Sequence, residues 1–142
     1  MPAAADPMEK FRTVAIYPAS ANLFIATVSM EFQPFARHGP EYSSTYVARV
    51  FPFFYTEKGR IWIVVPDELL RRVDRGEAVD FVGRALNDSG DSRKVVGHAV
   101  PTGPMTGKIR VRVFISRRLS LNYDTTYELK GEAGTPAAVT AR

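Results

Sequence analysis

Residues 108–129 alternate between apolar and polar side chains more regularly than any other part of the chain. The odd-numbered positions are mostly apolar from Ile109 to Ile115 and again from Leu119 to Leu129, while most even-numbered positions are polar or charged. Successive side chains of a β-strand point to opposite faces, so each run predicts a strand with one buried face. Together they predict an antiparallel hairpin with one dry and one wet face.

The same alternation restricts the register of this hairpin. The apolar positions are odd-numbered in both strands, so residues paired across the hairpin must have numbers that sum to an even value. A slip of one residue would turn the apolar set of one strand into solvent. We therefore expect the loop around Ser116–Arg118 to hold an odd number of residues, or the hairpin to carry a bulge. This register places Asp124 opposite Arg110 or Arg112.

Further strands are predicted where short apolar or aromatic runs are bounded by Gly, Pro and small polar residues. Arg60 to Val65 is nearly continuous apolar sequence, as expected for a strand covered on both faces. A loop is expected over residues 34–44 and a tight turn over residues 57–59. The expected strands are 12–17, 23–32, 45–55, 60–65, 77–87 and 93–100.

One helix is predicted, over residues 66–75. Pro66 suits a first helical turn, acidic residues follow it, and basic residues precede Gly76, which suits the C-terminal cap. Leu69, Leu70 and Val73 form a narrow apolar stripe, which should pack against the sheet. The fold class is therefore all-β: an antiparallel β-sandwich or barrel of about seven to eight strands with one short helix.

The chain divides into three predicted regions: a flexible tail at 1–10, a single β domain at 11–130 and a second flexible tail at 131–142. Its 142 residues and 45% hydrophobic content suit one domain with a real core. No cysteine is present, so disulfides are excluded. No transmembrane segment or signal peptide is recognised. A complete chain would be cytoplasmic, whereas a mature fragment with an added Met1 would come from an exported protein.

A short sequence repeat, Val82–Ala85 and Val96–Ala99, lies in two strands that are expected to pair. Gly83 occupies the second position of one copy and Gly97 that of the other. Two glycines on one face would leave a shallow dent, which a bulky side chain must fill because protein interiors pack without voids. The expected candidates are aromatic: Trp62, Phe51, Phe53 and Phe54. A bound ligand is the alternative occupant.

No stretch matches a cofactor, metal or catalytic motif. Residues 103–108 resemble a phosphate-binding loop but are one residue short and lead into a strand. His38 and His98, without cysteines, make a poor transition-metal site, and no nucleophile-elbow pattern supports a catalytic triad. No cofactor, catalytic residue or metal ligand is therefore assigned.

Basic residues on the wet face of the hairpin are the candidate ligand-binding residues. The chain carries a net charge of +4, which allows an anionic partner without requiring one. Acidic residues on the partner strand would neutralise part of this surface. The candidates are Lys108, Arg110, Arg112, Arg117 and Arg118.

These observations favour a non-catalytic binding or interaction module over two alternatives. Its partner is undetermined: a protein, a glycan, an anionic molecule, or a second copy through an edge strand. The first alternative is a nucleic-acid-binding barrel that uses the basic strand face. The second is an enzyme with a site near the dent at Gly83 and Gly97.

Overall fold

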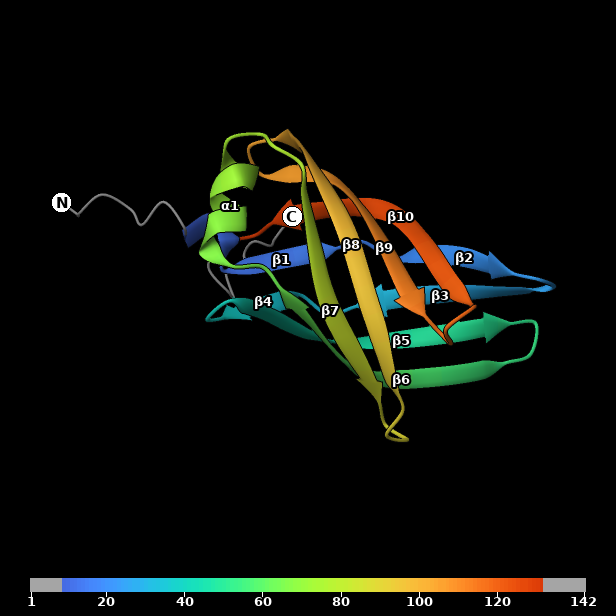
Figure 1. Ribbon diagram of the computed structural model, residues 1–142. Helices are drawn as coiled ribbons and strands as arrows, with labels where there is room; N and C mark the ends of the chain where they lie inside the picture. The colour runs from blue at the N-terminus through green and yellow to red at the C-terminus, as the bar shows by residue number, and fades with distance from the viewer. Residues whose placement is uncertain (1–8, 132–142) are drawn as a thin grey trace, which may run out of the picture.

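The computed structural model describes residues 9–131, and its strands curl around a common axis into a barrel (Figure 1). The predicted all-β class with one short helix is confirmed, and the architecture is the barrel rather than the sandwich. A 3-10 turn, Glu9–Phe11, precedes the first strand. The elements that follow are β1 (Thr13–Ile16), β2 (Ala19–Leu23), β3 (Ala26–Phe32), β4 (Phe35–His38), β5 (Glu41–Phe51), β6 (Tyr55–Val64), α1 (Asp67–Asp74), β7 (Val79–Asn87), β8 (Ser92–Gly103), β9 (Thr106–Phe114) and β10 (Ser120–Leu129).

The barrel is a closed ring of eight antiparallel strands with two additional strands. From β5 to β10 each strand pairs with the next, and β1 and β4 close the ring between β10 and β5. The hairpin of β2 and β3 extends this wall, because β3 pairs with residues 46–51 of β5. In the part of the chain that the structure describes, β2 pairs with β3 alone, so its other side is a sheet edge.

Side-chain alternation places the core inside the barrel. In β7, Val79, Phe81 and Ala85 are buried while the even-numbered residues between them are exposed. Val95 and Ala99 of β8 are buried in the same way. Adjacent side chains point to opposite faces of a strand, so one set of residues from each strand meets in the interior. The core face predicted for these strands is confirmed.

The dent at the two glycines is filled from within the sheet. Gly97 lies opposite Phe81, which makes Gly83 its diagonal neighbour, and a methyl group on Gly97 would overlap the Phe81 ring. The predicted fillers were wrong. Trp62 instead packs beside Arg84, whose guanidinium carbon lies 4.3 Å from the indole centroid. The other three candidates are exposed: Phe51, Phe53 and Phe54.

The predicted helix is confirmed as α1, and it covers one end of the barrel (Figure 1). Pro66 occupies the N-cap, and Gly76 follows the C-cap with a φ of 87°. The predicted stripe is present, but its contribution to the core is uneven. Leu70 is the buried residue, whereas Leu69 and Val73 are partly buried. We call this the closed end of the barrel.

The register predicted for the last hairpin is confirmed. Ser120 pairs with Phe114, so the connection spans five residues, 115–119. Asp124 lies opposite Arg110, one of its two predicted partners. The odd-numbered apolar residues of both strands therefore face the core together.

Several turns differ from their predicted places. Residues 57–59 lie inside β6, and the turn before it covers Pro52–Phe54 instead. Gly59 resembles a turn glycine in sequence, but a side chain there would collide with the backbone of Leu86 and Asn87. The glycine therefore serves close strand packing rather than a turn.

Two other predicted segments are subdivided in the structure. The expected loop at 34–44 contains β4 and the start of β5. The expected strand at 23–32 begins at the turn Phe24–Ile25, which joins β2 to β3. Residues 60–65 are not covered on both faces, because Trp62 and Val64 are only partly buried.

The structure describes only three residues of the two predicted tails, namely Glu9, Lys10 and Gly131. Of the first tail, Glu9 and Lys10 belong to the 3-10 turn, and Lys10 forms an ion pair with Asp74 of α1. Residues 1–8 and 132–142 lie outside the described part of the chain. Among residues 9–131, no helix has the length and apolar character needed to cross a membrane.

Candidate ligand-binding cavity

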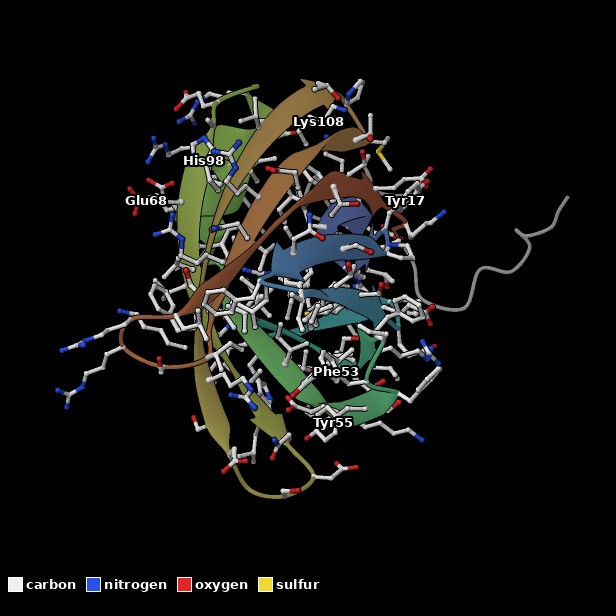
Figure 2. The ribbon with its side chains drawn as sticks, turned by 90° about the vertical axis from the view of Figure 1, so that its right-hand side faces the viewer. Tyr17, Phe53, Tyr55, Glu68, His98 and Lys108 are labelled. Atoms are coloured by element: carbon white, nitrogen blue, oxygen red, sulfur yellow. The ribbon has the colours of Figure 1, made fainter. Side chains whose placement is uncertain are left out.

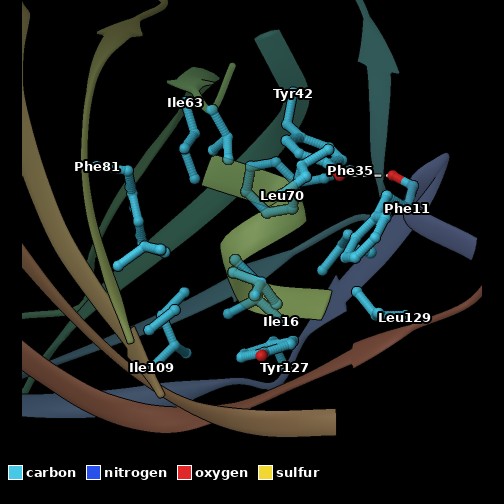
Figure 3. Close-up of a pocket in the computed structure, with 15 residues that line it drawn as sticks. Phe11, Ile16, Phe35, Tyr42, Ile63, Leu70, Phe81, Ile109, Tyr127 and Leu129 are labelled. Carbon is cyan, nitrogen blue, oxygen red and sulfur yellow. Dashed lines mark hydrogen bonds between the residues drawn. The ribbon is translucent and has the colours of Figure 1, made fainter. Parts of the chain in front are cut away.

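A small apolar cavity lies at the closed end of the barrel, beneath α1 (Figure 3). Its volume is about 70 Å³, and Leu70 of α1 contributes to its wall beside Phe35 and Tyr42. The Tyr42 hydroxyl donates a hydrogen bond to the carbonyl oxygen of Phe11. Its apolar walls suit a void that stays dry, as such cavities do in proteins.

A larger cavity, of about 180 Å³, lies toward the opposite end. We call this end the open end; the connections there are β2–β3, β5–β6, β7–β8 and β9–β10. The residues that line the cavity come from eight strands and the β9–β10 connection. They are Leu23, Val28, Met30, Tyr46, Ala48, Val50, Tyr55, Glu57, Ile61, Ala85, Arg93, Val113, Ile115, Leu121 and Tyr123.

An ion pair with an attached tyrosine forms one polar side of this cavity. Arg93 donates two hydrogen bonds to the Glu57 carboxylate, Nη2 to Oε1 at 2.9 Å and Nε to Oε2 at 3.2 Å. The Tyr46 hydroxyl donates to Oε2 of the same carboxylate at 2.7 Å. The side chains of Glu57 and Arg93 are only 11% and 18% exposed. A bidentate pair of this kind is both strong and directional.

Opposing influences act on the carboxyl of Glu57. Burial tends to raise its pKa, and this is the largest single contribution. The hydrogen bonds from Arg93 and Tyr46, the nearby Asn87 amide and the positive charge of Arg93 together outweigh burial, so the pKa of Glu57 lies below its usual value. The carboxylate is therefore charged at neutral pH. Burial, followed by the hydrogen bond to Glu57, raises the pKa of Tyr46, which stays a neutral donor.

Tyr123 carries the polar group of the cavity that lacks a partner. The residue is 3% exposed, and within residues 9–131 its buried hydroxyl has no hydrogen-bond partner. Burial raises its pKa, so the phenol is neutral and can donate a hydrogen bond. A buried polar group without a partner costs about 1–3 kcal/mol. The hydroxyl is thus a buried donor without a partner, on a residue that lines the cavity.

The predicted basic residues lie outside this cavity and do not form one cluster. Lys108, Arg110 and Arg112 are exposed on the outer face of β9, with Lys108 near the end of the barrel away from the β9–β10 connection (Figure 2). Arg110 Nε lies 2.7 Å from Asp124 Oδ1, and Arg112 Nε donates to Asn122 Oδ1 at 2.9 Å. Part of the basic surface is therefore paired, as expected.

The last two predicted basic residues, Arg117 and Arg118, are exposed in the β9–β10 connection at the open end. In the described part of the chain neither forms an ion pair with an acidic side chain. His98, on the outer face, has Nδ1 2.7 Å from Asp80 Oδ1. No group of three His, Asp or Glu side chains among residues 9–131 is placed to hold a metal ion.

The sequence analysis missed Glu57 and Arg93 as interior residues. Glu57 was assigned to a turn, although it shares the odd numbering of Ile61 and Ile63, which are buried in β6. Arg93 likewise shares the parity of Val95. A charged residue in phase with a buried strand face was the signal available for each.

Comparison of the chain with protein-family models, with curated proteins and with solved structures found no match.

Proposed function

We propose that this barrel is a non-catalytic binding module that holds a small, mainly apolar ligand in the cavity at its open end. The observation that carries the proposal is Tyr123, which lines this cavity and whose buried hydroxyl has no partner among the described residues. A ligand that supplies the missing acceptor would account for such a costly group. The ligand therefore combines an apolar body with a hydrogen-bond acceptor such as a carbonyl oxygen.

The size of the cavity supports a ligand of about one aromatic ring. Its volume of about 180 Å³ is close to that of engineered apolar cavities of about 150 Å³ that bind benzene. The nearby Glu57–Arg93 pair is electrically neutral as a unit, so it favours a neutral ligand over an ion. Arg93 also keeps guanidinium hydrogens that a second acceptor could use.

Nothing in the described part of the chain favours the two alternative functions over this one. The basic strand face is partly paired with Asp124 and Asn122. The dent that suggested a catalytic site is filled by Phe81. Lys108 and Arg110 line a hollow on the basic strand face, but none of its residues has a buried polar group without a partner, as Tyr123 does.

Acetophenone and ethylbenzene are suitable probes, because they are similar in shape and differ in a carbonyl oxygen. Calorimetric titration should show binding of both, with acetophenone the tighter. Tyr123→Phe should weaken acetophenone about fivefold, equivalent to a hydrogen bond of about 1 kcal/mol, and should not weaken ethylbenzene.

Blocking the cavity provides the matched control. Ala48 lines the cavity at the open end, and Ala99 lines the one at the closed end. Ala48→Leu should abolish binding of both probes, whereas Ala99→Leu should retain it, with thermal unfolding showing that each variant folds. Failure of the wild-type protein to bind either probe, or equal binding by the Ala48→Leu variant, would refute the proposal.

A further inference from the structure

Two neighbouring hairpin turns at the open end expose large apolar side chains. We call them the aromatic tips: Phe24 and Ile25 of the β2–β3 turn, with Phe51, Phe53 and Phe54 at the β5–β6 turn. Their exposed fractions are 89%, 82%, 64%, 57% and 87% in that order. Thr27 pairs with Phe51, so the turns are neighbours in the sheet, and they lie side by side in Figure 1. Phe53 and Tyr55 lie on the same rim in Figure 2.

The backbone at these turns favours other residues than the ones present. Leu23 pairs with Ala26, so Phe24 and Ile25 are the two central residues of a tight hairpin turn. Phe24 has a φ of 56°, and Phe54 has a φ of 57°. Glycine or asparagine is favoured in this left-handed conformation, and a bulky residue there is strained. Strain of this kind is concentrated at functional sites.

Phe24 and Phe54 thus combine two unfavourable features, a strained backbone and an almost fully exposed aromatic ring. Polar turn residues would remove both costs without altering the core. The same combination occurs twice, on turns that lie next to each other. This repetition indicates that the exposed rings have a partner.

We propose that the aromatic tips dock the open end of the barrel onto a lipid surface. The shape of the patch decides the class of partner. Its rings stand on convex turns that project from the wall, which suits insertion between lipid headgroups, where amphipathic elements bury apolar side chains about 5–10 Å deep. A contiguous apolar patch of this kind marks an interaction site.

The charges at the same end are compatible with this partner. Lys58, Arg117 and Arg118 are exposed there, opposed by Asp88 and Asp91 in the β7–β8 connection. Basic residues near an anionic membrane each contribute about 1 kcal/mol. Because basic and acidic side chains occur together at this end, insertion of the apolar side chains should supply most of the binding energy. Attraction to anionic lipids should add a smaller part.

Docking would also bring the cavity close to the lipid. Leu23 and Tyr55 flank the two turns and line the cavity. An apolar ligand could then pass between the bilayer and the barrel with little exposure to water. The docking surface nevertheless stands on its own observations, and the vesicle experiment below contains no cavity ligand, so each proposal can fail without the other.

Sedimentation with vesicles tests the docking surface on the full chain. The wild-type protein should sediment with phosphatidylcholine vesicles, and more strongly with mixed phosphatidylcholine and phosphatidylglycerol vesicles. Phe24→Asn and Phe54→Asn suit the left-handed backbone, so neither should lower thermal stability. Each should weaken vesicle binding about tenfold, as expected for losing part of the burial of a Phe side chain.

Met105→Asn is the matched control, because Met105 is 40% exposed in the β8–β9 turn at the closed end. This variant should bind vesicles as the wild type does. Wild-type protein that stays in the supernatant with both vesicle types would overturn the proposal. So would sedimentation velocity showing a wild-type dimer that Phe24→Asn converts to a monomer, because the tips would then serve a second copy of the chain.

Discussion

Replacing Tyr123 by Phe should stabilise the unliganded protein, which is unusual for a substitution in a buried core. The change removes the buried hydroxyl, which has no partner among residues 9–131, and leaves the ring in place. Tyr42 provides a matched comparison in the same barrel. Its hydroxyl is also buried, but it donates to the carbonyl oxygen of Phe11. Tyr42→Phe should therefore destabilise the protein.

The expected changes follow from the cost of unpaired polar groups. A buried group without a partner costs about 1–3 kcal/mol, so Tyr123→Phe should raise the free energy of unfolding by about 1–2 kcal/mol. Tyr42→Phe loses a hydrogen bond and leaves the Phe11 carbonyl unpaired, so it should lower that free energy by about 1–3 kcal/mol. The two variants should thus differ by about 2–5 kcal/mol, in opposite directions from the wild type.

Urea unfolding followed by tyrosine and tryptophan fluorescence measures this difference. Both variants should keep the denaturant slope of the wild type, because the surface exposed on unfolding hardly changes. The reasoning fails if Tyr123→Phe destabilises the protein as much as Tyr42→Phe does. The Tyr123 hydroxyl would then already be satisfied in the unliganded barrel, and the case for a ligand acceptor at that atom would be lost.

Two further predictions concern the open and closed ends. Glu57→Gln should lower stability at neutral pH by about 1–3 kcal/mol, because it leaves the partly buried Arg93 without its counter-ion. The pKa of Glu57 is lowered in the folded protein. Its carboxylate therefore stabilises the fold above the usual Glu pKa, and this stabilisation is lost as the pH falls through the folded-state pKa. Between about pH 5 and pH 3, the free energy of unfolding should therefore fall more steeply for the wild type than for Glu57→Gln. Parallel plots of this free energy against pH would contradict the prediction. Leu70→Ala should cost about 3–4 kcal/mol in chemical denaturation, from about 2.4 kcal/mol of lost transfer energy plus a cavity contribution. Leu69→Ala, at a partly buried position, should cost less, and the reverse order would mean that α1 packs in another orientation.

The sequence was sufficient to predict those elements in which apolar residues recur at a regular spacing. In the last hairpin, parity alone determined the face of each residue, restricted the loop to an odd length or a bulge, and reduced the partners of Asp124 to Arg110 or Arg112, of which Arg110 is the one observed. The helix was equally predictable, because Pro66 and Gly76 mark its two ends independently of the rest of the fold. Local geometry decides such features, so a single segment contains the information needed.

Closure of the barrel could not be predicted in this way. It depends on β5 pairing with β6 on one side and with both β3 and β4 on the other. The break between β3 and β4 lies at Gln33 and Pro34, and the predicted loop began at Pro34. A bend that keeps a strand in the same wall and a loop that leaves the sheet have similar local composition. Long-range pairing distinguishes them, and one sequence does not contain that information directly.

Glu57 of the candidate site was missed for a more specific reason, which is a misplaced turn. Residues 57–59 have the composition of a tight turn, whereas Phe53 and Phe54 have the composition of a strand. In the structure these roles are exchanged: Gly59 allows close strand packing, and the phenylalanines occupy the turn. Local propensity fails at both places, and such failures are expected where residues serve function rather than folding. Correcting that one turn places Glu57 in phase with Ile61 inside the barrel and exposes Phe53 and Phe54 at the turn. One acidic group of the cavity and one of the two aromatic turns are therefore both consequences of how one strand, β6, begins.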